Sequence, residues 1–93
     1  MADIYIQRSH QLGLAKARST AEKIAAHLQE KYQLDYGWEG ESIRFRRTGV
    51  SGRLNVSDDQ IGLEVRLGLL LTPLKHQIEQ EIRRYIDDLF SNA

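Results

Sequence analysis

The chain has 93 residues with 13 basic and 13 acidic side chains, so its formal net charge at pH 7 is zero. This balance removes the general electrostatic attraction to nucleic acid or to an anionic membrane, so any such binding would need a local patch. The lack of cysteine excludes a disulfide framework and a thiolate metal site. A chain of this length predicts a single domain over residues 1–93.

The N-terminus predicts neither secretion nor membrane insertion. Residues 1–8 lack the basic segment and the long apolar run of a signal peptide. No apolar run approaches the length of roughly 20 residues that spans a bilayer. We therefore expect a cytoplasmic protein with no transmembrane segment.

A strand and a helix are predicted first. From Asp3 to Arg8, Ile4 and Ile6 alternate with polar neighbours, which predicts a short strand. From about Gly13 to Tyr32 the apolar residues recur every three or four positions, which predicts a helix. Its apolar stripe consists of Leu14, Ala17, Ala21, Ile24, Leu28 and Tyr32. The alanines on that stripe would allow this helix to approach a sheet closely.

Three two-residue turns, at 40–41, 48–49 and 58–59, divide the middle of the chain into four strands. Together they place apolar residues in two rows on one face, Trp38-Ile43-Leu54-Leu63 and Tyr36-Phe45-Gly52-Val65. A one-residue slip at any turn would send these side chains to water, so the agreement predicts an antiparallel meander. Gly52 is expected to make room for the ring of Phe45.

The last strand and the last helix complete the pattern. Every odd position from Ile61 to Leu71 is apolar, which predicts a strand that runs through Leu71. Thr72 can cap the helix that follows, and Pro73 suits its first position. The helix carries an apolar stripe of Leu74, Ile78, Ile82, Tyr85, Ile86 and Leu89. Burial of five or six such side chains would contribute on the order of 10 kcal/mol before entropy is subtracted.

The predicted fold class is α+β, with the element order β-α-β-β-β-β-α. We expect an antiparallel four- to five-stranded sheet with two helices packed on one face. The sequence leaves the position of the first strand in this sheet open.

The same strand registers place arginines on the uncovered face of the sheet. The candidate residues for a partner or anion are Arg44, Arg46, Arg53 and Arg66. Arg44 is predicted opposite Arg53, where like charges are destabilising. Guanidinium groups make bidentate contacts with anions, so the face would suit an anion or an acidic partner surface.

The simpler interpretation is an ordinary solvated sheet face. Glu64 beside Arg53 and Asp35 beside Arg46 would then neutralise much of its charge. If Tyr5 and Leu70 join this face, it becomes amphipathic, which favours a homodimer or a protein partner over a free phosphate.

No catalytic, metal or cofactor site is predicted. The three histidines, His10, His27 and His76, fall on different elements, and no nucleophile elbow is present. The aromatic residues of the meander are expected to point inward, so the sheet lacks the exposed rings that single-stranded nucleic acid requires.

Taken as a whole, the sequence resembles the small polyhydroxyalkanoic acid system proteins, also described as granule-region proteins. The resemblance is carried by Asp3-Ile4-Tyr5-Ile6, His10, Leu12-Gly13-Leu14, Tyr36-Gly37-Trp38-Glu39-Gly40, Phe45, Gly49-Val50-Ser51-Gly52, Leu63-Glu64-Val65-Arg66-Leu67-Gly68 and Ile86-Asp87-Asp88-Leu89-Phe90. It implies a link to polyhydroxyalkanoate storage in bacteria and brings no enzymatic activity or catalytic residues.

Three hypotheses follow. The first is a non-catalytic accessory protein that binds a protein partner through the open sheet face, or associates with the surface of a storage granule. The alternative is a small ligand carrier or enzyme with an apolar pocket between helices and sheet, which would need a cavity of at least roughly 300 Å³. The third is a self-associating module such as a homodimer.

Overall fold

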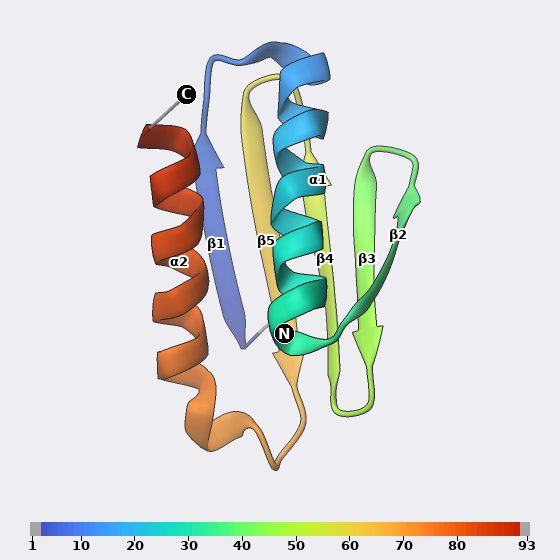
Figure 1. Cartoon of the computed structure of the whole chain (residues 1–93), viewed down its shortest axis with the longest axis vertical. Coiled ribbons are helices and arrows are strands. Elements are labelled where there is room, and N and C mark those ends of the chain that lie inside the picture. Colours follow the sequence, from blue (N-terminus) through green and yellow to red (C-terminus); the bar gives the residue numbers. More distant parts are fainter. Residues whose placement is uncertain (1–2, 92–93) are drawn as a thin grey trace.

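The computed structural model describes residues 3–91 and consists of one sheet and two helices (Figure 1). The strands are β1 (Ile4–Ser9), β2 (Asp35–Glu39), β3 (Ser42–Arg47), β4 (Val50–Val56) and β5 (Gln60–Leu67). Helix α1 (Gly13–Tyr32) follows β1, and a 3₁₀ turn (Thr72–Leu74) leads into helix α2 (Lys75–Ser91). The predicted α+β class and element order are confirmed.

All five strands form one antiparallel sheet in the order β1-β5-β4-β3-β2. The predicted registers are confirmed: Trp38 pairs with Ile43, Ile43 with Leu54, and Leu54 with Leu63. The first strand lies beside the last, with Ile4 opposite Val65. The predicted meander therefore gains its fifth strand at the β5 edge.

Glycine serves two different purposes in this sheet. Gly40 and Gly49 adopt positive φ angles of 62° and 82° in the first two turns, as tight hairpins require. Gly52 pairs with Phe45 as predicted, but the nearest obstacle to a side chain at this position is the backbone of β5 and not the Phe45 ring. A Cβ atom at Gly52 would lie 2.8 Å from the carbonyl oxygen of Glu64, so the position admits only glycine because the backbone of β5 approaches closely.

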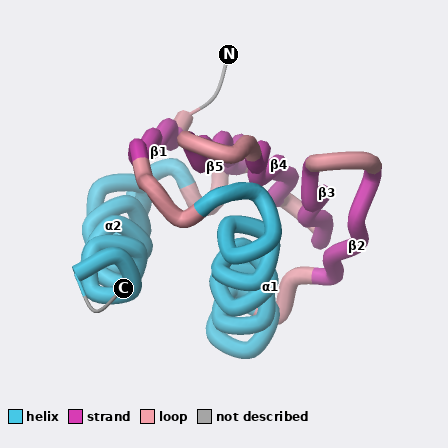
Figure 2. Tube along the Cα trace, turned by 90° about the horizontal axis from the view of Figure 1, so that it is seen from above, coloured by secondary structure: helices cyan, strands magenta, loops and turns pink. Residues whose placement is uncertain are grey.

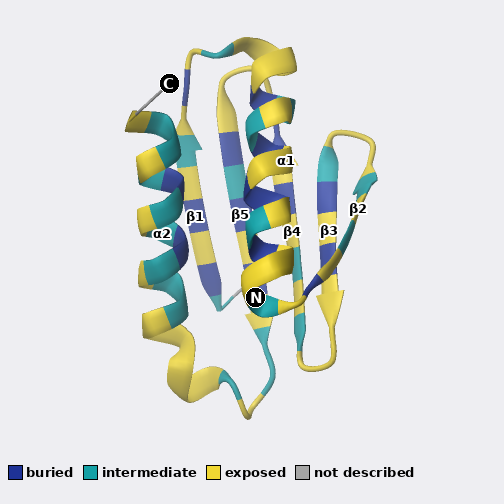
Figure 3. Ribbon diagram, in the orientation of Figure 1, coloured by how far each residue is buried: buried dark blue, intermediate teal, exposed yellow. Residues whose placement is uncertain are grey.

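Both helices lie on the same face of the sheet, and the other face is open (Figure 2). Helix α1 lies over β4 and β2, and α2 lies along β1. Buried residues occur in the strands and in both helices (Figure 3), and the hydrophobic core that they form includes residues of β1, β3, β4 and β5. Sequence alternation of period two therefore produces a sheet with one apolar face and one polar face.

The last strand is shorter than predicted. It ends at Leu67 rather than Leu71, because the backbone N–H of Gly68 donates to the carbonyl of Gly49 at 2.6 Å and the chain then turns away. The alternation continues for four more residues without a partner strand. Leu70 therefore does not join the open sheet face and is 94% exposed in the loop, whereas Tyr5 does join that face, opposite Glu64.

Helix α2 begins later than predicted and is less buried. The hydroxyl of Thr72 donates back to the carbonyl of Gly68 at 3.1 Å instead of capping the helix, and Pro73 lies in the 3₁₀ turn. Only Ile82 and Ile86 of its apolar stripe are buried, and Leu74 is 47% exposed. The expected burial of five or six side chains is therefore wrong.

Within residues 3–91, neither helix has the length and apolar character needed to cross a membrane.

Candidate functional sites: an arginine face and an apolar groove

The four predicted arginines meet on the open side of the sheet. We call this surface the arginine face; it consists of Arg44, Arg46, Arg53 and Arg66. All four are exposed and together line a shallow hollow of about 350 Å³. Ser51 and Gly52 also line this hollow, and their small size leaves room between the longer arginine side chains.

The charge on this face is only partly balanced by nearby acids. Arg44 lies opposite Arg53, as predicted, and forms an ion pair with Glu39 in which Nη1 and Oε1 are 3.6 Å apart. Asp35 and Glu64 do lie beside Arg46 and Arg53 in the register, yet within residues 3–91 neither acid forms an ion pair with them. Both acids therefore lie where predicted, and Glu64 lines the same hollow, but in the described part of the chain they balance these arginines only at longer range than a direct ion pair.

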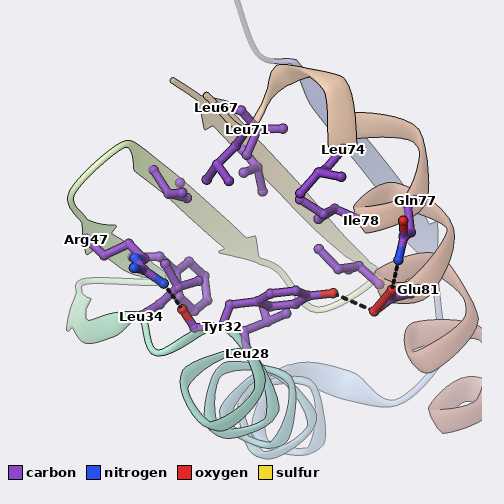
Figure 4. A pocket seen from close by; sticks show the side chains of 15 residues that line it. Leu28, Tyr32, Leu34, Arg47, Leu67, Leu71, Leu74, Gln77, Ile78 and Glu81 are labelled. Carbon is purple, nitrogen blue, oxygen red and sulfur yellow. Dashed lines mark hydrogen bonds between the residues drawn. The ribbon is translucent and has the colours of Figure 1, made fainter. Parts of the chain in front are cut away.

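A second concave site lies on the opposite side of the sheet, between α1, α2 and the β3–β4 hairpin (Figure 4). This apolar groove has a volume of about 240 Å³. Its apolar wall includes Leu28, Leu34, Phe45, Val50, Val65, Leu67, Leu71, Leu74 and Ile78. The groove exists because α2 buries only two of its stripe residues and leaves part of the sheet uncovered.

Polar groups are confined to the rim of the apolar groove. On one side Arg47 donates from Nη1 to the carbonyl of Tyr32 at 2.7 Å. On the other side the Tyr32 hydroxyl donates to Glu81 at 3.1 Å, and Lys31 forms an ion pair with the same carboxylate at 2.6 Å. Figure 4 shows Arg47 and Glu81 on opposite sides of the apolar side chains.

These rim contacts shift two pKa values in opposite directions. Hydrogen bonds from Lys31, Tyr32 and Gln77 hold the pKa of Glu81 below its usual value of 4.5. Burial, followed by the hydrogen bond to Glu81, raises the pKa of Tyr32 to about 12. Both groups therefore keep one protonation state through the neutral range, and the rim is a fixed structural link between the helices.

The histidines lie in three separate environments. His10 is buried; it accepts from the Leu12 N–H through Nδ1 at 3.2 Å, and its Nε2 lies 3.2 Å from the Ser57 carbonyl oxygen. His27 stacks on Tyr85 with 3.7 Å between ring centroids, and His76 is exposed. Among residues 3–91 no three His, Asp or Glu side chains form a group that could hold a metal ion.

The residues of the arginine face could be named from the sequence, whereas an apolar pocket between helices and sheet was only an alternative with no residues assigned to it. Its polar rim joins Arg47, Tyr32 and Glu81 from β3, α1 and α2, and no local spacing links them. One signal was present: the stripe of α2 contains more large apolar residues than one helix can bury against an edge strand.

The fold and its two concave surfaces define a class: a small α+β protein with a helix-covered apolar side and an open basic side. Comparison with protein families matches residues 4–90 to the family described as "putative polyhydroxyalkanoic acid system protein". The match covers most of the chain, so the protein belongs to this family, and the suspected resemblance is confirmed. No curated protein and no solved structure matches the chain.

Proposed function

We propose that this member of the polyhydroxyalkanoic acid system family is a non-catalytic accessory protein that binds an acidic surface on a protein partner through its arginine face. The observation that supports this proposal most is the arrangement of four arginines around one hollow. Arginine side chains in such a hollow can form bidentate contacts with the carboxylates of a partner.

The pairing of Arg44 with Arg53 supports a binding role because it disfavours the isolated fold. Directly opposed like charges destabilise an antiparallel pair, and an acidic partner would relieve that repulsion. Stability given up at a surface position is a common cost of a binding site.

The test compares two forms of the isolated storage granule: one with its surface proteins intact and one stripped by protease. We expect the purified chain to sediment with the intact granules and to stay in solution with the stripped ones. The Arg44→Glu/Arg53→Glu variant should lose the binding. The matched control is Lys16→Glu/Lys23→Glu, which makes the same charge change on exposed positions of α1.

Two results would contradict this proposal. Equal binding by the folded Arg44→Glu/Arg53→Glu variant would exclude the arginine face as the contact surface. Equal binding to stripped granules would exclude a protein partner and indicate adsorption to polyester. Circular dichroism of each variant establishes that it is folded before it is compared.

The apolar groove is smaller than the cavity of roughly 300 Å³ expected for a ligand carrier, so it restricts this second candidate function to a small ligand. Its volume of about 240 Å³ is below the range of roughly 300–1,000 Å³ for drug-sized ligands, so its ligand would be small and mostly apolar. Calorimetric titration with decanoate tests this function. Binding that is abolished by Ile78→Trp, which would fill the groove, would support the carrier; no heat of binding to the native chain would eliminate it.

A further inference from the structure

The loop between β5 and the 3₁₀ turn forms the lower end of the molecule in Figure 1 and carries two exposed leucines. Leu69 and Leu70 are 92% and 94% exposed, in the loop between β5 and the 3₁₀ turn. We call this pair the leucine tip. Single exposed apolar residues are ordinary on protein surfaces, but two adjacent leucines that contact almost nothing are not explained by packing.

The leucine tip is held outward by a closed hydrogen-bonded turn. The carbonyl of Gly68 accepts from the N–H of Leu71 at 3.0 Å and from the N–H and hydroxyl of Thr72, both at 3.1 Å. The N–H of Gly68 is in turn bonded to Gly49, which fixes the base of the loop on the β3–β4 hairpin. These contacts orient the two leucines away from the core before any partner is present.

Basic side chains lie near the base of the tip although the whole chain is neutral. A surface hollow beside the tip is lined by Gly68 and by Arg46, Arg47 and Arg66, and the exposed Lys75 follows the 3₁₀ turn. Acidic hairpin residues are concentrated at the opposite end, where the turns of 40–41 and 58–59 lie. The acids toward this end of the sheet include Asp3, which accepts from the Leu67 N–H at 2.8 Å, and Asp35 on the edge strand.

We propose that the leucine tip inserts into an anionic phospholipid surface while the surrounding cations contact the head groups. Exposed leucines bury their side chains below the head groups, and basic residues near the surface add electrostatic attraction. The proposal shares Arg46 and Arg66 with the arginine face, so it is tested at the tip leucines and at Lys75, which do not belong to that face.

A second copy of the chain fits this surface less well. A symmetric dimer would bring the tip of one copy against the tip of the other. The basic side chains near the two tips would then repel each other. The apolar surface of two leucine side chains and a half-exposed Leu74 is also far smaller than the roughly 800 Å² that each partner buries in a stable interface. A surface of opposite charge avoids both problems.

Vesicle binding by the whole chain tests the proposal. We expect the protein to sediment with vesicles of phosphatidylcholine and phosphatidylglycerol in equal parts, and not with phosphatidylcholine alone. Leu69→Ser/Leu70→Ser should weaken binding by about a hundredfold, since each buried leucine contributes at least about a tenfold change in affinity. Lys75→Gln should weaken it by a few fold, and Leu14→Ser, at an exposed leucine on α1, is the control.

Direct insertion can be measured because the native chain has no cysteine. A single Leu70→Cys substitution carries an environment-sensitive fluorophore, and Leu14→Cys carries it in the control. Only the label at position 70 should report an apolar environment when anionic vesicles are added.

Three results would overturn the proposal. The first is equal vesicle binding by the Leu69→Ser/Leu70→Ser variant, and the second is no binding by the native chain. The third is a concentration-dependent dimer that the same variant abolishes, because the tip would then be a self-association surface. In each case the arginine face remains intact, so these results leave the proposed protein partner untouched.

Discussion

The two helices cover the same sheet in different ways. Helix α1 buries five residues, of which Ala17, Ala21 and Ala25 are small enough to bring its backbone close to the strands. Helix α2 buries only Ile82 and Ile86 against the edge strand β1. Small residues thus produce a tight interface under α1, whereas the larger side chains of α2 leave the apolar groove between the helices. Coverage of a sheet depends on how closely a helix approaches, in addition to how apolar its stripe is.

The largest expected effect comes from truncating one isoleucine under each helix. Ile24→Ala under α1, at a fully buried position, should lower the free energy of unfolding by about 2–5 kcal/mol. Ile78→Ala at the half-buried groove should lower it by less than about half as much, because little new cavity is created. Urea denaturation measures both, and equal losses would contradict the difference between the helices.

Enlarging a side chain tests the same comparison from the opposite direction. Ala21→Leu should cost about 1–3 kcal/mol, since the space between α1 and the sheet is already filled. Ile78→Phe should be nearly neutral because the added atoms can enter the apolar groove. Thermal unfolding of both variants gives the contrast, and a similar loss for Ile78→Phe would mean that the groove is closed in solution.

A smaller effect is expected where α1 holds the β2 edge of the sheet. Trp38 donates from Nε1 to Glu22 at 3.0 Å, and the guanidinium of Arg18 lies 4.5 Å from its ring centroid. Trp38→Phe keeps a ring for Arg18 and removes the N–H donor, so it should cost about 0.5–1.5 kcal/mol. Trp38→Leu is the comparison variant, and it should cost more because the cation–π contact is also lost.

The smallest effects concern pH. The pKa of Glu22 is lowered by hydrogen bonds from Tyr36 and Trp38, and that of Glu81 by bonds from Lys31, Tyr32 and Gln77. In both cases the unfolded chain takes up the proton first, so the stabilisation is complete above pH 4.5 and is lost as the pH falls below that value.

Added salt should change the stabilising contributions of these two carboxylates to different extents. Glu81 faces the ammonium of Lys31, so added salt should weaken its contribution, whereas Glu22 is held by neutral donors and should respond little. Urea unfolding of Glu22→Gln and Glu81→Gln between pH 3 and 7 measures this difference, and equal salt dependence would contradict it.

At high pH, the raised pKa of Tyr32 predicts that the stability of the fold decreases above pH 10, because the tyrosine of the unfolded chain ionises first. The Tyr32→Phe variant should lose less stability over the same range.

Sequence reasoning worked where an interaction is local. Each hairpin register follows from a two-residue turn and a period-two pattern, so the pairs of Phe45 with Gly52 and of Arg44 with Arg53 could be placed without coordinates. The arginine face was found for the same reason. The limits of α1 also follow from its periodic stripe, because a run of 20 residues leaves little ambiguity.

Sequence reasoning failed for features that are determined by packing between distant segments, such as the end of β5 and the burial of α2. The alternation through Leu71 looks like a strand, but hydrogen bonds from Gly68 to Gly49 and back from Thr72 end it and leave the leucine tip exposed. The stripe of α2 likewise predicted deeper burial than the structure has. A periodic pattern identifies which side chains could be buried, but the neighbouring elements determine how many are.

The amino-acid sequence by itself determined the α+β class, the turns, the meander registers and the sidedness of the sheet, because these depend on neighbours only a few residues apart. Only the tertiary structure decided that β1 joins β5, that α2 leaves the apolar groove open and that Leu69 and Leu70 project from the sheet. These features depend on contacts between distant segments and on the volumes that fill the space between them, and no local pattern encodes either.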